Sequence, residues 1–210
     1  MKIKELLKKY LPAALIRQRL GKDAAGSILL TFDDGPCAET TPQVLDILDR
    51  YQVKAAFFVV GNRIEKSPEI LRMIAERGHL VGNHSYHHSP RPLVNPFRIF
   101  DDLRKCAALI KGCGIEDHRI YRPPCGRLSP LTFFVAKILG YRIVFWSVEG
   151  QDWNCRSEVE AANISQKILN EISGRDIVLL HDDNRYVLKI LEKLLPALIE
   201  RGFLFSASIS

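Results

Sequence analysis

The feature that most constrains the fold is an alternation of apolar runs and helical segments from residue 27 onward. The apolar runs have the length and the content of Val, Ile and Phe that buried strands have. They start near residues 27, 55, 79, 119, 142, 176 and 203. Strands that alternate with helices form a parallel sheet covered by helices. The pattern therefore predicts an α/β fold, either an open doubly wound sheet or a small distorted (β/α) barrel of about seven strands.

Helix boundaries are marked by capping residues. Four helices are expected to start at a Ser, Thr or Asn followed by Pro, because the side-chain oxygen accepts from free backbone N–H groups and proline fits the first helical position. These pairs are Thr41 with Pro42, Ser67 with Pro68, Asn95 with Pro96, and Ser129 with Pro130. Gly78, Gly140 and Gly202 stand where glycine commonly follows a helix end.

The length of 210 residues suits one domain with its own core. No run of 18 apolar residues is present, so a transmembrane helix is not expected. No small-residue cleavage site follows the basic N-terminus, so a secretory signal peptide is not expected either. Five cysteines, an odd number without a C-x-x-C pair, indicate reduced thiols. These features favour a cytoplasmic location.

Positive charge is concentrated at the N-terminus. The formal net charge is +6, and residues 1–20 hold six Lys or Arg and one Glu, which gives +5 and leaves +1 for the other 190 residues. A nucleic-acid-binding face on the main domain is therefore not expected. We interpret residues 1–26 as a basic amphipathic arm and residues 27–210 as the main domain. The arm either packs on the domain or lies on an anionic membrane surface.

Polar side chains follow two of the predicted strands. The motif T-F-D-D-G-P (residues 31–36) places Asp33 and Asp34 after the first strand, and H-S-Y-H-H (residues 84–88) follows the third. A buried carboxylate is costly unless something pairs with it. Two imidazoles and one carboxylate are common ligands of a catalytic zinc, and they leave a position for water. The two motifs therefore predict a metal site, and a surface histidine cluster is the plainer alternative.

Three further strand ends carry polar or aromatic residues. They are Y-R-P-P-C-G (residues 121–126), W-S-V-E-G-Q-D-W (146–153) and V-L-L-H-D-D (178–183). Each alone is a weak signal, because arginine and proline are frequent in surface loops and a histidine at a strand end is commonly structural. The carboxyl ends of parallel strands meet at one edge of a sheet, so we expect the five clusters to form one site.

In this order, the five motifs resemble the polysaccharide deacetylase family, the NodB-homology group also called carbohydrate esterase family 4. The resemblance covers about residues 27–208. It implies a distorted (β/α) barrel with outer helices and a hydrolase that removes N-acetyl groups from a sugar or polysaccharide, releasing acetate. It also implies a divalent metal, above all zinc, held by Asp34, His84 and His88, whereas His87 does not occupy a ligand position.

The resemblance further implies the acid and base of the reaction. Asp33 matches the general base, and Arg122 matches the arginine that orients it. His181 matches the general acid that protonates the leaving amine, and Asp152 matches the aspartate that supports this acid.

The resemblance also implies three substrate contacts. The backbone N–H of Cys125 would donate to the oxyanion, and Trp153 and Leu179 would line the pocket for the acetyl methyl. Cys125 stands where the family often has an aromatic residue, and Glu149 stands where it often has aspartate. These departures bear on the substrate more than on the chemistry.

Other functions remain open from the sequence. The same site could hydrolyse a small non-sugar amide or an O-acetyl ester, because the metal chemistry is similar. A catalytically silent module that binds glycan or membrane is a third interpretation. The expected partner is an N-acetylated glycan, and a lipid-linked glycan precursor would suit the basic arm. The protein would then act at the inner membrane face, with peripheral contact through residues 1–20.

Overall fold

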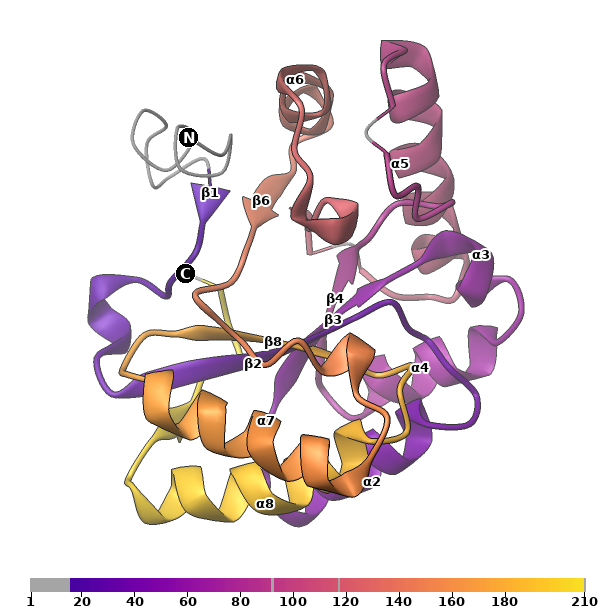
Figure 1. Cartoon of the computed structure of the whole chain (residues 1–210). Helices are drawn as coiled ribbons and strands as arrows, with labels where there is room; N and C mark the ends of the chain where they lie inside the picture. The colour runs from indigo at the N-terminus through magenta and orange to yellow at the C-terminus, as the bar shows by residue number, and fades with distance from the viewer. Residues whose placement is uncertain (1–15, 92, 117, 210) are drawn as a thin grey trace.

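The computed structural model describes residues 16–91, 93–116 and 118–209, and it shows a strongly curved parallel sheet with helices around it (Figure 1). The strands run in the order β1-β6-β5-β4-β3-β2-β8-β7, and β9 is added to β2. Every pairing between these strands is parallel. The strands are β1 (Ile16–Arg17), β2 (Ser27–Asp33), β3 (Ala55–Val59), β4 (Leu80–Asn83), β5 (Ile120–Tyr121), β6 (Arg142–Val144), β7 (Val148–Glu149), β8 (Ile177–His181) and β9 (Leu204–Phe205). The prediction of a distorted (β/α) barrel is confirmed.

Helices cover the outside of the curved sheet in two groups. One core packs β2, β3 and β8 against α2, α7 and α8, and a second packs β5 and β6 against α5 and α6. The α-helices are α2 (Thr41–Arg50), α3 (Gly61–Ile64), α4 (Pro68–Glu76), α5 (Pro96–Gly112), α6 (Pro130–Ile138), α7 (Glu158–Glu171) and α8 (Val187–Glu200). Three short 3-10 turns are η1 (Lys22–Ala24), η2 (Pro124–Gly126) and η3 (Asp152–Asn154). No described helix has both the length and the apolar character needed to cross a membrane.

The predicted helix caps are confirmed at two of four positions. The side chains of Asn95 and Ser129 accept bonds from the free N–H groups of α5 and α6. Ser67 occupies the cap position of α4 without a side-chain cap bond. The prediction for Thr41 is wrong, because Thr40 is the cap residue of α2 and the Thr41 hydroxyl bonds to Asp182 instead. The same hydroxyl accepts from the Cys37 N–H at 2.8 Å, so neither of these partners lies in the first turn of α2.

The apolar run that starts at residue 142 forms two strands rather than one. β6 ends at Val144 and lies beside β5, whereas β7 starts at Val148 and lies beside β8. The chain therefore crosses from one end of the curved sheet to the other between these residues. This crossing makes the sheet a barrel with a gap, and it leaves carbonyl groups at the break that need donors.

The two faces of β2 differ in a way that sets up the site. Ile28, Leu30 and Phe32 face the helices and belong to the outer core. On the opposite face, inside the barrel, the residues change from apolar Leu29 to polar Thr31 and Asp33, because side chains alternate along a strand. The carboxyl end of the barrel interior is therefore polar while its other end is apolar.

Residues 16–26 are packed on the domain. β1 pairs with β6, and the Arg19 guanidinium lies 3.0 Å from the buried carboxylate of Asp176. The Arg175 side chain donates to the carbonyl of Leu20 at 2.9 and 3.0 Å. The predicted arm at 1–26 otherwise falls on residues 1–15, which lie outside the described residues, so its helix and membrane-facing surface stay predictions.

Candidate active site

The five polar motifs come together at the carboxyl ends of the strands. Asp33 ends β2 and His181 ends β8, and these two residues are direct neighbours in the β2–β8 register. His84 follows β4, and Arg122 follows β5. Asp152 lies in η3, directly after β7. Parallel pairing thus brings together residues that are up to about 150 positions apart in the chain.

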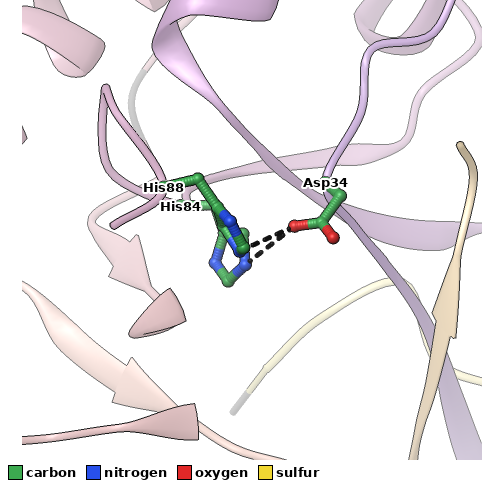
Figure 2. Close-up of side chains that lie close together, drawn as sticks. All are labelled: Asp34, His84 and His88. Atoms are coloured by element: carbon green, nitrogen blue, oxygen red, sulfur yellow. Dashed lines mark ion pairs between the residues drawn. The ribbon is translucent and has the colours of Figure 1, made fainter. Parts of the chain in front are cut away.

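Asp34, His84 and His88 form a compact group (Figure 2). Oδ1 of Asp34 lies 2.9 Å from Nε2 of His88 and 3.4 Å from Nε2 of His84. One ligand atom from each of the three residues lies within 4.8 Å of the other two. Among the described residues these three form the group of His, Cys, Asp or Glu side chains that could hold a metal ion, and Cys125 is not part of it.

The backbone at this group adopts conformations that side chains rarely favour. Asp34 has φ +75° and His88 has φ +50°, and Ser85 between the histidines has φ +68°. Such left-handed residues cost about 1 kcal/mol or more each and persist where surrounding contacts fix them. Gln52, Arg119 and Arg175 adopt the same conformation in turns and loops elsewhere, but here three such residues belong to one side-chain group or lie between its members.

The orientation of the side chains in the group fits a cation. Nδ1 of His84 lies 2.7 Å from the carbonyl of Arg122 and donates to it, so Nε2 is the ring nitrogen that faces Asp34. Oδ1 of Asp34 is buried and has no hydrogen-bond partner of normal geometry in the described part of the chain. The atoms that face one another are therefore those that would ligate a metal ion, which replaces the protons of the imidazole Nε2 atoms on binding. The residues present fit a divalent ion.

Asp34 and His88 shift the pKa values of each other. Burial raises the pKa of Asp34, but the contacts and positive charges of His84 and His88 outweigh it and hold this pKa well below its usual range. Burial lowers the pKa of His88, and the Asp34 carboxylate more than offsets this, so the His88 pKa is raised. Asp34 is thus an anion at neutral pH, as a metal ligand must be.

Asp33 is held by a fully buried arginine. Arg122 donates from one guanidinium nitrogen to Oδ1 of Asp33 at 2.7 Å and to the hydroxyl of Thr31 at 2.8 Å. It also donates to the carbonyls of Val144 and Phe145 at 3.2 and 3.1 Å. These carbonyls lie at the end of β6, where the chain leaves this strand and crosses to β7. The Arg122 guanidinium therefore donates to carbonyls at the break in the sheet, and it also orients Asp33.

His181 is paired with Asp152. Oδ1 of Asp152 lies 2.9 Å from Nδ1 of His181, and Oδ2 accepts from the His181 backbone N–H at 2.7 Å. Burial lowers the pKa of His181, but the hydrogen bond and charge of Asp152, with the charges of Asp33 and Asp34, raise it to about 9. The imidazole is therefore protonated at neutral pH and presents Nε2 as a proton donor.

The three predicted substrate contacts differ in exposure. Leu179 is buried on β8, two residues before His181 and on the same face. Trp153 is 61% exposed and lines an open groove of about 510 Å³ with Cys37, Thr40 and Tyr186. Cys125 is an exposed residue in η2 at φ +52°. Partial desolvation of its sulfur raises the pKa of the thiol, and the Asp34 charge adds to this against the opposing charge of Arg127. The thiol is therefore neutral.

Asp182 is a buried site residue that the sequence analysis missed. Its Oδ2 accepts from the Thr41 hydroxyl at 2.5 Å, its carbonyl accepts from the Thr40 hydroxyl, and its carboxylate lies against Gly35. Burial raises its pKa to about 7, with the charges of Asp183 and Asp34 adding to the effect and the Thr41 bond opposing it. The signal in the sequence was the pair of acids that directly follows His181 at the end of β8, of which Asp182 is the first.

Comparisons with known proteins agree with this geometry. The sequence profile of the family described as polysaccharide deacetylase matches residues 21–144. A peptidoglycan N-acetylglucosamine deacetylase of Bacillus cereus is 34% identical over 183 residues, which is 85% of this chain and 84% of that protein. A peptidoglycan N-acetylmuramic acid deacetylase of Bacillus subtilis is 31% identical over 189 residues, 90% of this chain and 72% of that protein.

A solved structure supports the same assignment. The crystal structure of a peptidoglycan N-acetylglucosamine deacetylase superposes with a TM-score of 0.86 at 28% identity, covering 98% of this chain and 94% of that one. The prediction of an enzyme is confirmed. The relatives named above hydrolyse carbon–nitrogen bonds other than peptide bonds, and this chain belongs to their family, the polysaccharide deacetylases of carbohydrate esterase family 4.

Proposed function

We propose that this protein is a metal-dependent N-deacetylase that removes acetyl groups from N-acetylated sugars of a peptidoglycan-type glycan. The observation that carries the proposal is the convergence of Asp34, His84 and His88 beside two oriented pairs, Asp33 with Arg122 and His181 with Asp152. The relatives named above, which act on N-acetylglucosamine and N-acetylmuramic acid, supply the substrate class.

A divalent ion held by Asp34, His84 and His88 would polarise the acetyl carbonyl and acidify a water, and one carboxylate with two imidazoles favours zinc. Asp33 is the base in this mechanism. Its Oδ1 is tied to Arg122, and its Oδ2 lies 3.7 Å from Nε2 of His84, on the side of the ligand group. Oδ2 removes the proton as the water oxygen bonds to the acetyl carbon.

The leaving group is handled by His181. Because its Nδ1 is held by Asp152, Nε2 carries the proton that goes to the sugar nitrogen as the carbon–nitrogen bond breaks. The products are acetate and a free amine. The backbone N–H of Cys125 stabilises the oxyanion, a contribution of about 3 kcal/mol for one such donor. Trp153 and Leu179 contact the acetyl methyl.

The test is acetate release from N-acetylglucosamine oligomers and from peptidoglycan strands. We expect release that stops on chelation and returns with Zn²⁺, and no release from His88→Ala under the same conditions. Activity that survives complete chelation would contradict the metal dependence. Release from O-acetyl esters or small non-sugar amides, with none from either glycan, would favour the alternative substrates over the glycan.

We also propose that the protein acts in the cytoplasm, at the inner membrane face, on a lipid-linked glycan. Its support is the charge of residues 1–20 and the set of free cysteines in the described chain. Basic residues near an anionic membrane contribute about 1 kcal/mol each to binding. Sedimentation with anionic vesicles but not with neutral ones is expected. A protein that stays in the supernatant with both would remove the support for the membrane part.

A further inference from the structure

The loop that carries both histidines of the candidate metal group is bent into an unfavourable shape. Between His84 and His88, Ser85 has φ +68°, and His88 itself has φ +50°. Neither residue is a glycine, so the loop holds this shape only if contacts outside it fix it. The position of the His88 imidazole depends directly on these backbone angles.

One side chain of α5, the next helix along the chain, accepts hydrogen bonds from the middle of this loop. Asp102 lies on α5 and is 8% exposed. Its Oδ2 accepts from the backbone N–H of Tyr86, and its Oδ1 accepts from the backbone N–H of His87, both at 3.2 Å. Nδ1 of His87 lies 2.6 Å from the same Oδ1. Asp102 therefore satisfies two successive backbone donors that the bent loop turns inward.

The other hydrogen bonds of the loop do not involve the N–H groups that Asp102 accepts from. Two bonds lie within the motif and its preceding residue, from Ser85 N to Oδ1 of Asn83 and from His88 N to the Ser85 hydroxyl. On the α3 side, the carbonyls of Ser85 and Tyr86 accept from Gly61 and Asn62. These bonds hold the carbonyl side of the loop, whereas the carboxylate of Asp102 holds its donor side.

We propose that Asp102 is a positioning residue for the metal site, acting on His84 and His88 through the backbone between them. This inference rests on the proposed metal-dependent function. Without the carboxylate, the buried N–H of Tyr86 and the partly buried N–H of His87 lose their acceptors, and the loop can relax out of the left-handed conformation. Nε2 of His88 then leaves its position 2.9 Å from Oδ1 of Asp34.

The proposed effect of Asp102 on the metal site depends on its two backbone hydrogen bonds and not on its contact with the His87 ring. The His87 side chain is 70% exposed, lines a groove with Arg98 and Lys105, and is not a member of the Asp34 group. Removing this ring leaves both backbone bonds to Asp102 in place. The two effects can therefore be separated by substitution.

The experiment measures Zn²⁺ affinity of the full-length metal-free protein by competition with a chromophoric chelator. We expect Asp102→Ala to bind Zn²⁺ at least about tenfold more weakly than wild type, the loss typical of groups that orient ligands. Asp102→Asn keeps one acceptor oxygen, so an intermediate affinity is expected. His87→Ala and Asp101→Ala, the exposed neighbour on α5, should bind within about twofold of wild type.

Thermal unfolding of the metal-free variants separates positioning from general damage. A positioning role requires that Asp102→Asn, folded like wild type, still binds Zn²⁺ more weakly. Wild-type affinity in both Asp102 variants would overturn the inference, and so would an equal loss in Asp101→Ala. His88→Ala distinguishes this failure from failure of the metal site itself. If wild type and His88→Ala bind Zn²⁺ alike, the proposed function fails, and not only the role of Asp102.

Discussion

At the residue scale, Asp33 and His181 each use one side-chain atom for orientation and another for proton transfer in the proposed mechanism. Asp33 and His181 are each tied through one atom, and the other atom stays available for proton transfer. The tie fixes the orientation and the protonation state together. The consequences can be tested one residue at a time.

Asp33→Asn removes the proposed base and leaves the metal ligands unchanged. We expect kcat to fall by about 10² to 10⁴, the usual contribution of a positioned base, while Zn²⁺ stays bound. Acetate release and metal content, measured on the same preparation, check this. The base assignment would fail if turnover stayed close to that of the wild type.

The partner of His181 sets the alkaline limit of activity. The folded-state pKa of His181 is raised to about 9, so the protonated acid is present below this pH and is lost above it. A bound cation would oppose the charges of Asp33 and Asp34, so the holoenzyme should lose activity at or somewhat below pH 9. In Asp152→Asn, without the carboxylate, the alkaline limb of kcat should move to lower pH. An unmoved limb would remove His181 from the role of acid.

At the element scale, strand ends and turns are fixed by buried polar contacts that cross the sheet. The turn after β2 is packed against the loop after β8, because the carboxylate of Asp182 lies on Gly35 and bonds to Thr41 at the start of α2. The start of β3 has a similar dependence on His79, whose ring accepts from the Ala55 N–H. Both arrangements predict changes in stability.

A methyl group at Gly35 would collide with Asp182, whose Cγ lies 2.7 Å from the place of the new Cβ. Gly35→Ala should therefore cost about 1–3 kcal/mol of unfolding free energy and reduce kcat, because the turn carries Asp33 and Asp34. Gly112→Ala is the matched control, since nothing lies within 4 Å and Gly112 ends helix α5. It should be neutral or stabilise by up to about 1 kcal/mol. Denaturant unfolding with equal midpoints for both variants would contradict this packing.

His79 should make the fold sensitive to acid. Burial and the charges of Lys54 and Arg77 lower the pKa of His79 to about 4, against the opposing charge of Asp49. Its Nδ1 accepts from the Ala55 N–H, and protonation of this nitrogen would break that bond. Because the folded pKa lies below the unfolded value of about 6.5, stability is complete above pH 6.5 and falls towards pH 4 by up to about 1.4 kcal/mol per pH unit. His79→Asn keeps an acceptor and should flatten this part of the curve of unfolding free energy against pH. A parallel curve in this variant would assign the acid sensitivity to other groups.

At the scale of the whole molecule, the fold extends further towards the N-terminus than its strand pattern suggests. Ile16 and Leu20 are buried, and Arg175 and Asp176 bond to the same segment. The segment covers the edge strand β6 through β1. It is therefore part of the domain in the described structure.

Leu20→Ala tests this extension. Leu20 is 1% exposed in the core, so the substitution should cost about 2–5 kcal/mol of unfolding free energy. Leu204→Ala removes the same atoms at a residue 65% exposed and should change stability by about 0.5 kcal/mol or less. If the two variants unfold at the same denaturant concentration, residues 16–26 behave as a separable arm.

The sequence by itself determined the α/β class, most helix ends and the set of polar strand ends, because these depend on periodicity and capping chemistry within a few residues. It placed Asp33, Asp34, His84, His88, Arg122, Asp152 and His181 at one edge of a sheet. Only the tertiary structure decided the break between β6 and β7, the burial of Arg122 beneath it, and the roles of Asp182 and Asp102. Those features depend on which strands and helices become neighbours, and a local pattern does not encode a partner many residues away.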